Sequence, residues 1–246
     1  MYPRFLETPI REALKDTRVV ALAGPRQSGK STLARSIAGA GATYLSLDEA
    51  INFKAASDDP TGFIRRTQGL TVIDEIQRVP ELMLAIKLAV DEDPAPGRFL
   101  ITGSADIRTI PSIQDSLAGR IQVFELLPLS RDEVGGGRSS FLTDVFAGRL
   151  PEAGALEPEE LQRLVAIGGF PEAIARTNRA RRLDWFEAYA QALIEQDVAD
   201  IAHLDRLSVV RRFATSWRFR IGRFSGSCGL RFKRPAAGAA SVDWRW

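Results

Sequence analysis

Cysteine and histidine are almost absent from this sequence of 246 residues, which contains one of each, Cys228 and His203. A single cysteine cannot form a disulfide bond within the chain. Two such residues are also too few for a zinc site with the usual nitrogen and sulfur ligands. Any metal ion bound by this protein is therefore expected to be held by oxygen atoms.

Long apolar runs are missing as well. The most apolar stretch, "LMLAIKLAV", is short and contains Lys87, whereas a membrane-spanning helix needs about 20 apolar residues. The first residues, "MYPRFLETPIREAL", lack the apolar core of a signal peptide. The sequence therefore predicts a cytoplasmic location and no membrane partner. With 45% hydrophobic and 26% charged residues, its composition is that of a globular protein.

Acidic residues are scarce at the C-terminal end. Residues 206–246 contain nine arginines and one lysine but a single acid, Asp243. This segment therefore carries a charge of +9, and because the net charge of the chain is +2, the remainder carries −7. Such a split predicts either an arm that binds nucleic acid or a segment translated out of frame.

The stretch "AGPRQSGKST", residues 23–32, carries the clearest motif. An apolar run at residues 18–24 predicts a buried strand before it, and "STLARSIAGAG" predicts a helix after it. Strand, loop and helix are the context that the phosphate-binding motif G-x-x-x-x-G-K-[ST] requires. The residues predicted to bind a nucleotide are Gly24, Pro25, Gln27, Ser28, Gly29, Lys30, Ser31 and Thr32.

The residue types in this loop suit a chain of phosphates. Glycines allow the backbone to turn its N–H groups toward the ligand, and the helix that follows adds its N-terminal dipole. Lys30 is expected to bind the β and γ phosphates of ATP, and the Ser31 hydroxyl is expected to ligate Mg²⁺. The alternative is an exposed glycine-rich turn, which the flanking strand and helix disfavour.

A second buried strand is predicted in "GLTVIDEIQ", where Asp74 and Glu75 follow the apolar run. Asp74 is expected to hold Mg²⁺ together with Ser31, as the Walker B carboxylate does. Glu75 is expected to polarise the attacking water as a general base. The alternative is a surface acidic pair, which is common after a strand.

Three further strands are predicted in "ATYLSLDEA", ending at Asp48, in "GRFLITGSAD" and in "RIQVFELLPLS". Strands that alternate with helical stretches predict an α/β fold with a parallel sheet covered by helices on both faces. Thr102 and Ser104 are polar residues at the end of the "GRFLITGSAD" strand. Ser104 is predicted either to contact the γ phosphate or the attacking water, or simply to end the strand.

The motifs "GPRQSGKSTLA", "VIDEIQRVPEL", "GRFLITGSAD", "SLAGRIQVFELLPLS" and "GGFPEA" occur here in a characteristic order. Over residues 4–207 the sequence resembles a large family of bacterial and archaeal AAA-type ATPases that carry a C-terminal domain of unknown function. The resemblance implies a P-loop NTPase fold of the additional-strand, catalytic-glutamate class, followed by a small helical lid. It also implies binding of ATP with Mg²⁺ and hydrolysis of ATP, in a cellular role that it leaves unassigned.

The resemblance points to two more site residues. Arg120 would act as an arginine finger or a γ-phosphate sensor, in its own subunit or in a neighbouring one. The alternative for Arg120 is a helix-end arginine without a catalytic role. The motif "GGFPEA" resembles the lid motif that lies near the nucleotide, which would place Pro171 in the site. Without the resemblance, the same residues predict only a turn between two helices.

Three segments are expected: an ATPase core at residues 1–130, a helical lid region at 131–207, and a basic aromatic tail at 208–246. The tail is predicted to be disordered or out of frame. An ATP hydrolase is the leading functional hypothesis. The alternatives are a nucleotide-gated switch with little turnover and a nucleic-acid-binding module that uses the tail. A homo-oligomer or a protein partner is left open.

Overall fold

The structure of the protein is a computed structural model that describes residues 2–104, 117, 119–137, 140–149 and 157–193. The chain divides into two units, Met1–Arg182 and Leu183–Trp246. The tail at residues 208–246, with the predictions made for it, lies outside the described residues.

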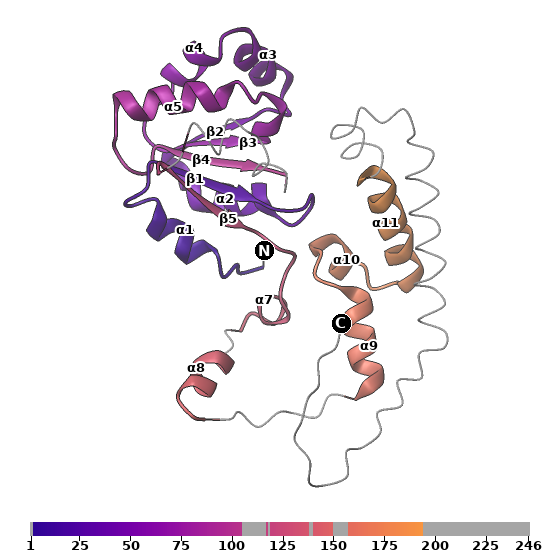
Figure 1. Ribbon diagram of the computed structural model, residues 1–246. Coiled ribbons are helices and arrows are strands. Elements are labelled where there is room, and N and C mark those ends of the chain that lie inside the picture. Colours follow the sequence, from indigo (N-terminus) through magenta and orange to yellow (C-terminus); the bar gives the residue numbers. More distant parts are fainter. Residues whose placement is uncertain (1, 105–116, 118, 138–139, 150–156, 194–246) are drawn as a thin grey trace, which may run out of the picture. The chain divides into compact units, whose positions relative to one another are not determined.

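The first unit is built around a five-stranded parallel sheet (Figure 1). Its strands are β1 (Val19–Ala23), β2 (Thr43–Ser46), β3 (Thr71–Asp74), β4 (Phe99–Gly103) and β5 (Ile121–Glu125). The described helices of the chain are α1 (Glu7–Ala13), α2 (Lys30–Ala38), η1 (Gly39–Gly41), α3 (Ala50–Asp58), α4 (Pro60–Arg65), η2 (Ile76–Arg78), α5 (Leu82–Glu92), α7 (Arg131–Gly135), α8 (Phe141–Phe146), α9 (Pro158–Ile167), α10 (Pro171–Ala175) and α11 (Arg179–Ala192).

The strand order is β2-β3-β4-β1-β5, and the neighbouring strands run parallel. β4 therefore lies between β1, which precedes the phosphate-binding loop, and β3, which ends in Asp74. This inserted strand is the arrangement expected for the additional-strand class. The α/β P-loop NTPase fold predicted from the sequence is confirmed.

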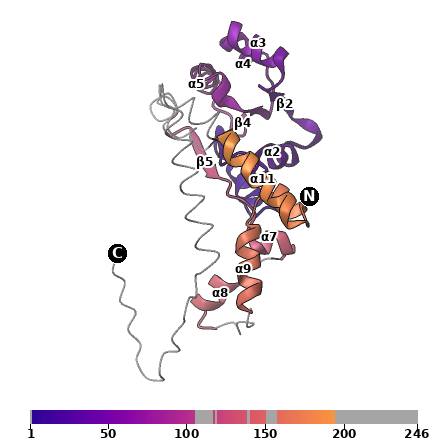
Figure 2. The same ribbon diagram turned by 90° about the vertical axis from the view of Figure 1, so that its right-hand side faces the viewer.

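Every residue of β1, β3 and β4 is buried, because helices cover both faces of the sheet (Figures 1 and 2). Alternate side chains of a strand point to opposite faces. Val19 and Ala21 of β1 pack with α3, α4 and α5, whereas Val20 and Leu22 pack with α1 and α2. The near-continuous apolar strands of the sequence thus reflect burial on both sides.

One predicted strand boundary differs from the structure. β2 ends at Ser46 and not at Asp48, because the Ser46 carbonyl accepts the Glu49 N–H at 3.2 Å and the chain turns there. Asp48 is exposed and forms an ion pair with Arg78, with Oδ1 and Nη1 2.6 Å apart.

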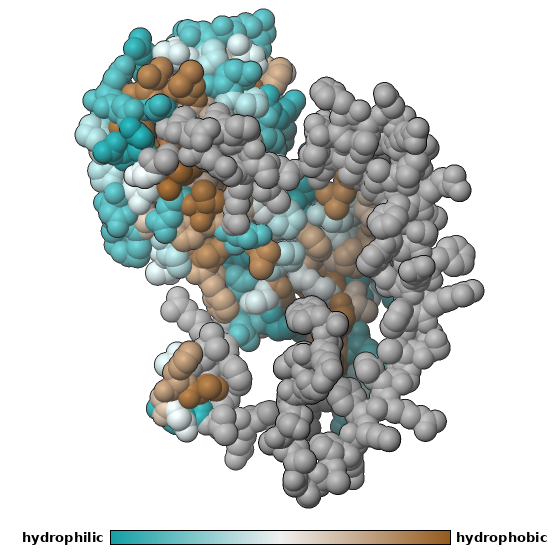
Figure 3. All heavy atoms as spheres, viewed as in Figure 1, coloured by the Kyte–Doolittle hydropathy of each residue, from teal (hydrophilic) through white to brown (hydrophobic). Residues whose placement is uncertain are grey.

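The described surface is mixed in polarity. Figure 3 shows hydrophilic residues over much of the upper helices together with apolar surface around α5, where Leu84 and Leu88 are exposed. In the part of the chain that the structure describes, no helix combines the length and the apolar character needed to span a bilayer.

Candidate nucleotide-binding site

The phosphate-binding loop connects the carboxyl end of β1 to the first residue of α2, Lys30. Gln27 and Gly29 have positive φ values of 59° and 98°, which turns successive backbone N–H groups in the manner of an anion-binding nest. Gly24 is required for a different reason. A Cβ at this position would lie 2.3 Å from the carbonyl oxygen of Leu126, so no larger residue fits against the segment that follows β5.

Lys30 is buried, with 5% of its surface exposed. Its ammonium group donates hydrogen bonds to the carbonyl oxygens of Gly24 and Pro25, each at 3.0 Å. These bonds offset the cost of burying the charge. They also hold the ammonium group against the loop that is predicted to bind phosphates.

Asp74 is the centre of a cluster of hydroxyl groups. The Ser31 hydroxyl donates to Asp74 Oδ1 at 3.1 Å, and the Thr102 hydroxyl donates to the same oxygen. The Tyr44 hydroxyl donates to the other oxygen, Oδ2, at 2.6 Å. Burial and the bond to Asp74 raise the pKa of the Tyr44 phenol above its ordinary value. The two predicted metal ligands, Ser31 and Asp74, are thus brought into direct contact.

Glu75 follows β3 and adopts a left-handed backbone conformation, with φ of 63°. This conformation is uncommon for a residue other than glycine and is frequent at functional sites. The Glu75 N–H donates to Thr102 Oγ1 at 3.2 Å, and the Gln77 side-chain amide donates to the Glu75 carboxylate. Thr102 therefore links Asp74 and Glu75 through one hydroxyl group.

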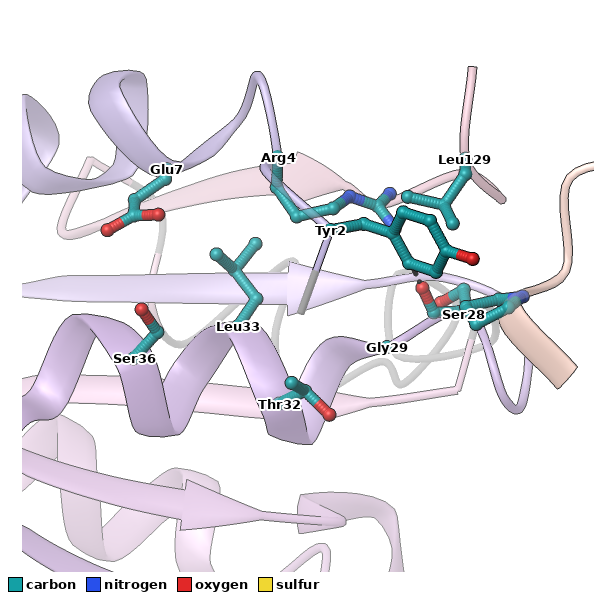
Figure 4. Close-up of a pocket in the computed structure, with 10 residues that line it drawn as sticks. Tyr2, Arg4, Glu7, Ser28, Gly29, Thr32, Leu33, Ser36 and Leu129 are labelled. Atoms are coloured by element: carbon teal, nitrogen blue, oxygen red, sulfur yellow. Dashed lines mark hydrogen bonds between the residues drawn. The ribbon is translucent and has the colours of Figure 1, made fainter. Parts of the chain in front are cut away.

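A cavity of about 220 Å³ adjoins the loop within the first unit. Its walls come from the N-terminal segment, the loop, α2 and the chain after β5 (Figure 4). In Figure 4 the Tyr2 ring lies beside Ser28 and Leu129, and Leu33 projects from α2 toward α1. Ser28 is buried, and its hydroxyl has no hydrogen-bond partner among the described residues. The lining residues are Tyr2, Arg4, Glu7, Ser28, Gly29, Thr32, Leu33, Ser36, Leu129 and Pro171.

Arg4 and Glu133 form a buried ion pair at the edge of this cavity, with Nε and Oε1 3.2 Å apart. The Arg4 guanidinium also donates to the carbonyl oxygens of Ser28 and Leu127, at 3.0 and 2.5 Å. Desolvation lowers the pKa of Arg4 from its ordinary value, and the nearby Glu133 carboxylate partly opposes this shift. One side chain thus ties the phosphate-binding loop to the chain after β5.

Several of these contacts were missing from the sequence-based prediction. Glu133 was detectable, because Ser130 and Glu133 have the spacing of a helix capping box, which α7 indeed forms. Arg4 and Gln77 have no comparable local signal, since their partners are set by the fold. Tyr44 belongs to β2, and the sequence pattern of this strand indicates only that its side chain is partly buried. The pattern does not indicate that its hydroxyl reaches Asp74 on the neighbouring strand.

Pro171 lies in the wall of the cavity that Ser28 also lines, and its predicted role in a lid stays a prediction. It is the first residue of α10, and Gly168 caps α9, so the predicted turn between two helices is present. Gly169 accepts the Leu129 N–H at 2.7 Å, and a Cβ here would lie 2.3 Å from the Leu129 oxygen. Ser104 directly follows β4 and is partly exposed.

Arg120 lies at the other end of the sheet. It precedes β5, whereas the phosphate-binding loop follows β1, and the first residues of these two strands pair with each other. Its Nε donates to Asp91 Oδ1 at 2.5 Å. A five-residue strand spans about 16 Å, so Arg120 lies about the length of a strand from the loop of its own chain. A role in a neighbouring subunit stays a prediction.

The loop, the acidic end of β3 and the strand order together define an α/β P-loop NTPase. Residues 16–135 match the family model described as an AAA domain, and residues 158–231 match one described as a domain of unknown function. Residues 16–135 are thus similar to AAA domains. The second match extends past Leu207 and overlaps the segment predicted to be out of frame, and that prediction is not confirmed.

Two relatives and one solved structure indicate how far the similarity reaches. An uncharacterized protein of Mycobacterium tuberculosis is 30% identical over 220 residues, which are 89% of this chain and 45% of that protein. A cytidylate kinase of Streptococcus suis is 28% identical over 116 residues, 47% of this chain and 48% of the kinase. The chain thus spans about half the length of these relatives. A Walker-type ATPase of Pyrococcus abyssi has a TM-score of 0.49 and 15% identity, covering 82% of this chain and 75% of that one.

Proposed function

We propose that this protein binds ATP with Mg²⁺ at the carboxyl end of its sheet and hydrolyses it to ADP and phosphate. The observation that carries the proposal is the contact between Ser31 and Asp74, 3.1 Å apart, at the start of a helix whose first residue is the buried Lys30. A phosphate-binding loop alone fits many ligands. A hydroxyl and a carboxylate that meet beside it fit a nucleotide with its metal ion.

The loop residues would hold the phosphates. On nucleotide binding, the Lys30 ammonium exchanges its bonds to the Gly24 and Pro25 carbonyls for bonds to phosphate oxygens. The backbone N–H groups of the loop and of the first turn of α2 supply further donors. This exchange replaces two neutral acceptors by charged ones, which form stronger hydrogen bonds.

The donor set at Ser31 and Asp74 fits Mg²⁺. Both residues offer oxygen, and Mg²⁺ sites commonly use one or two protein oxygens together with phosphates and water. Among the described residues there is no cluster of three or more His, Cys, Asp or Glu that could hold a metal ion, so a site completed by the nucleotide is the fitting kind. When bound, Mg²⁺ neutralises charge that builds up on the phosphates.

Glu75 is the proposed general base. Its carboxylate would accept a proton from a water molecule while the water oxygen bonds to the γ phosphorus and the bond to the ADP oxygen breaks. Thr102 and Gln77 hold the backbone and the carboxylate of Glu75. Ser104, which follows the same strand as Thr102, is proposed to contact the γ phosphate or the water.

The adjoining cavity would take the nucleoside. It begins at Ser28 and Gly29 of the loop and continues between Tyr2, Leu33 and Leu129. Its walls are largely apolar apart from a few polar groups, as is usual for a ligand pocket. Pro171 in this wall supports the further proposal that residues 131–207 act as a lid.

The proposal is tested by incubating the purified chain with Mg·ATP and measuring released phosphate and retained nucleotide. Steady release of phosphate supports the hydrolase. Tight retention of ATP without release supports the nucleotide-gated switch instead. ADP formation that depends on added CMP would indicate a kinase and overturn the hydrolase. The assay includes CMP because part of the chain is similar to a cytidylate kinase.

Nucleic acid is a second proposed partner, based on the charge of residues 206–246. Arginines interleaved with aromatic residues suit single-stranded nucleic acid. A gel shift at increasing salt, with the whole chain and with a chain ending at Leu207, tests this proposal. Equal, salt-independent behaviour of the two proteins would remove the tail as a binding arm.

A further inference from the structure

The two oxygens of the Asp74 carboxylate have separate partners. Oδ1 accepts the hydroxyl groups of Ser31 and Thr102, and Oδ2 accepts the hydroxyl group of Tyr44 at 2.6 Å. Oδ1 is therefore the oxygen that faces the phosphate-binding loop. The bond from Tyr44 engages only Oδ2, so it does not compete with the partners of Oδ1.

The fold fixes the Tyr44 side chain from two directions. Tyr44 belongs to β2, which pairs with β3 so that Tyr44 is opposite Val72 and Ser46 is opposite Asp74. Its ring packs in the apolar cluster between the sheet and α2. The Arg35 guanidinium of α2 lies 3.8 Å from the ring centroid, within the range of a cation–π contact. The phenol hydroxyl is thus presented to Asp74 by a strand and a helix together.

An aspartate carboxylate needs such a restraint. The torsion that rotates it has a broad, two-fold energy profile, so the carboxylate turns easily unless hydrogen bonds hold it. Ser31 would lose its bond to Asp74 if its hydroxyl ligated a metal ion. The hydroxyl groups of Thr102 and Tyr44 would then still hold the carboxylate. Thr102 holds Oδ1, and Tyr44 holds Oδ2.

We propose that Tyr44 is a positioning residue that fixes the rotation of the Asp74 carboxylate, so that Oδ1 and the Ser31 hydroxyl can hold the same Mg²⁺. This inference rests on the proposed nucleotide site and adds a residue from β2 to it. Tyr44 itself touches neither the nucleotide nor the metal ion. Its contribution is to the affinity for Mg²⁺, whereas the loop and the cavity set the affinity for the nucleotide.

The substitution Tyr44→Phe separates these two affinities. Phenylalanine keeps the ring in the apolar cluster and beneath Arg35 but removes the donor to Oδ2. Binding of a fluorescent ADP is measured in EDTA and then across a titration with Mg²⁺. We expect the affinity in EDTA to stay within about twofold and the Mg²⁺ midpoint to rise about tenfold, as for the loss of one hydrogen bond to a charged group. Thr17→Val, which removes a hydroxyl that donates to the Asp16 carboxylate before β1, should change neither value.

Each other outcome has a definite meaning. An unchanged or lower Mg²⁺ midpoint in Tyr44→Phe would overturn the positioning role. Weaker binding in EDTA as well would assign Tyr44 a structural role, and circular dichroism at the titration temperature confirms that the variant is folded. If the unaltered protein binds no ADP, with or without Mg²⁺, the proposed function itself fails, which is distinct from a failure of Tyr44 alone.

Discussion

The two ends of the parallel sheet both carry charged side chains, but they hold them differently. At the carboxyl end four charged side chains are buried: Lys30 and Asp74 are 5% and 4% exposed, and the side chains of Arg4 and Glu133 are 9% and 7% exposed. At the amino end an arginine precedes each of β1, β4 and β5, and the acids that these arginines meet are in contact with solvent. Burying a charge is costly, so a fold that retains charges inside one end has a use for them there.

The amino-end arginines have a structural use. Arg18 and Arg98 donate to the carbonyl oxygens of Val90 and Ala89 at the end of α5, each at 3.4 Å. Cations at this position complement the negative end of a helix dipole. Arg120 binds Asp91 of the same helix, so it belongs with these arginines. The comparison shows that Lys30 and Asp74, which the sequence motifs point to, are buried more deeply than the side chains of Arg18 and Arg120.

The largest expected effect follows from removing the buried cation at the carboxyl end. Lys30→Ala should weaken ATP binding roughly a thousandfold, about 4 kcal/mol, because two charge-assisted hydrogen bonds to phosphates are lost. Isothermal calorimetry measures the change. The control is Lys54→Ala, which removes a lysine from an exposed pair with Asp58 and should leave binding unchanged. Equal affinities in the two variants would refute the assignment of the phosphate site.

The buried ion pair gives the next effect, and this one concerns stability. Glu133→Gln should lower the free energy of unfolding by about 3 kcal/mol, since it leaves the Arg4 guanidinium buried without its counter-charge. Asp93→Asn makes the same chemical change at the amino end, where the partner of Arg98 is 58% exposed, and should cost less than about 1 kcal/mol. Urea unfolding of both variants measures the difference. Equal losses of unfolding free energy would mean that the ion pairs at the two ends contribute equally to stability.

The rate of phosphate release distinguishes a carboxylate at the candidate site from an exposed carboxylate on α5. Glu75→Gln should retain Mg·ATP while phosphate release falls about a hundredfold, close to 2.7 kcal/mol, the usual contribution of a positioned general base. Glu92→Gln, on α5 and exposed in its pair with Arg65, should release phosphate at the normal rate. Normal turnover in Glu75→Gln would remove this carboxylate from the mechanism.

Much of the fold could be predicted from the sequence because its signals are local. The apolar runs that became β1, β3 and β4 are buried on both faces, and the loop motif has the strand and helix that it needs. The order of the strands followed from resemblance, since nothing in the residues of β4 says that it inserts between β1 and β3. The end of β2 was misplaced because a turn at Ser46 leaves no strong mark in "YLSLDEA".

Only some residues of the candidate site have a local signal in the sequence. Lys30, Ser31 and Asp74 are found by motif, but their actual partners come from distant parts of the chain. Tyr44 reaches Asp74 across 30 positions and Arg4 reaches Glu133 across 129, and neither pair has a fixed spacing that a pattern could detect. For Arg120 the sequence left its own subunit and a neighbouring one open, and only the register of β1 with β5 shows that it lies at the far end of the sheet from the loop of its own chain.

The smallest expected effect is that of Arg120→Ala. This variant tests whether an arginine at the amino end of the sheet contributes to turnover at the carboxyl end. If Arg120 only binds Asp91, Arg120→Ala should cost less than about 1 kcal/mol of stability and leave phosphate release unchanged, because a partly exposed pair contributes little. An arginine finger is worth roughly 10³-fold or more in turnover, so the two roles differ by far more than the error of a phosphate assay. A large loss would contradict the structural role. Mixing the Arg120→Ala and Lys30→Ala variants then shows where Arg120 acts. The first variant keeps the phosphate-binding loop, and the second keeps the arginine. Recovery of turnover in the mixture therefore requires that the Arg120 of one chain acts at the phosphate-binding loop of another chain.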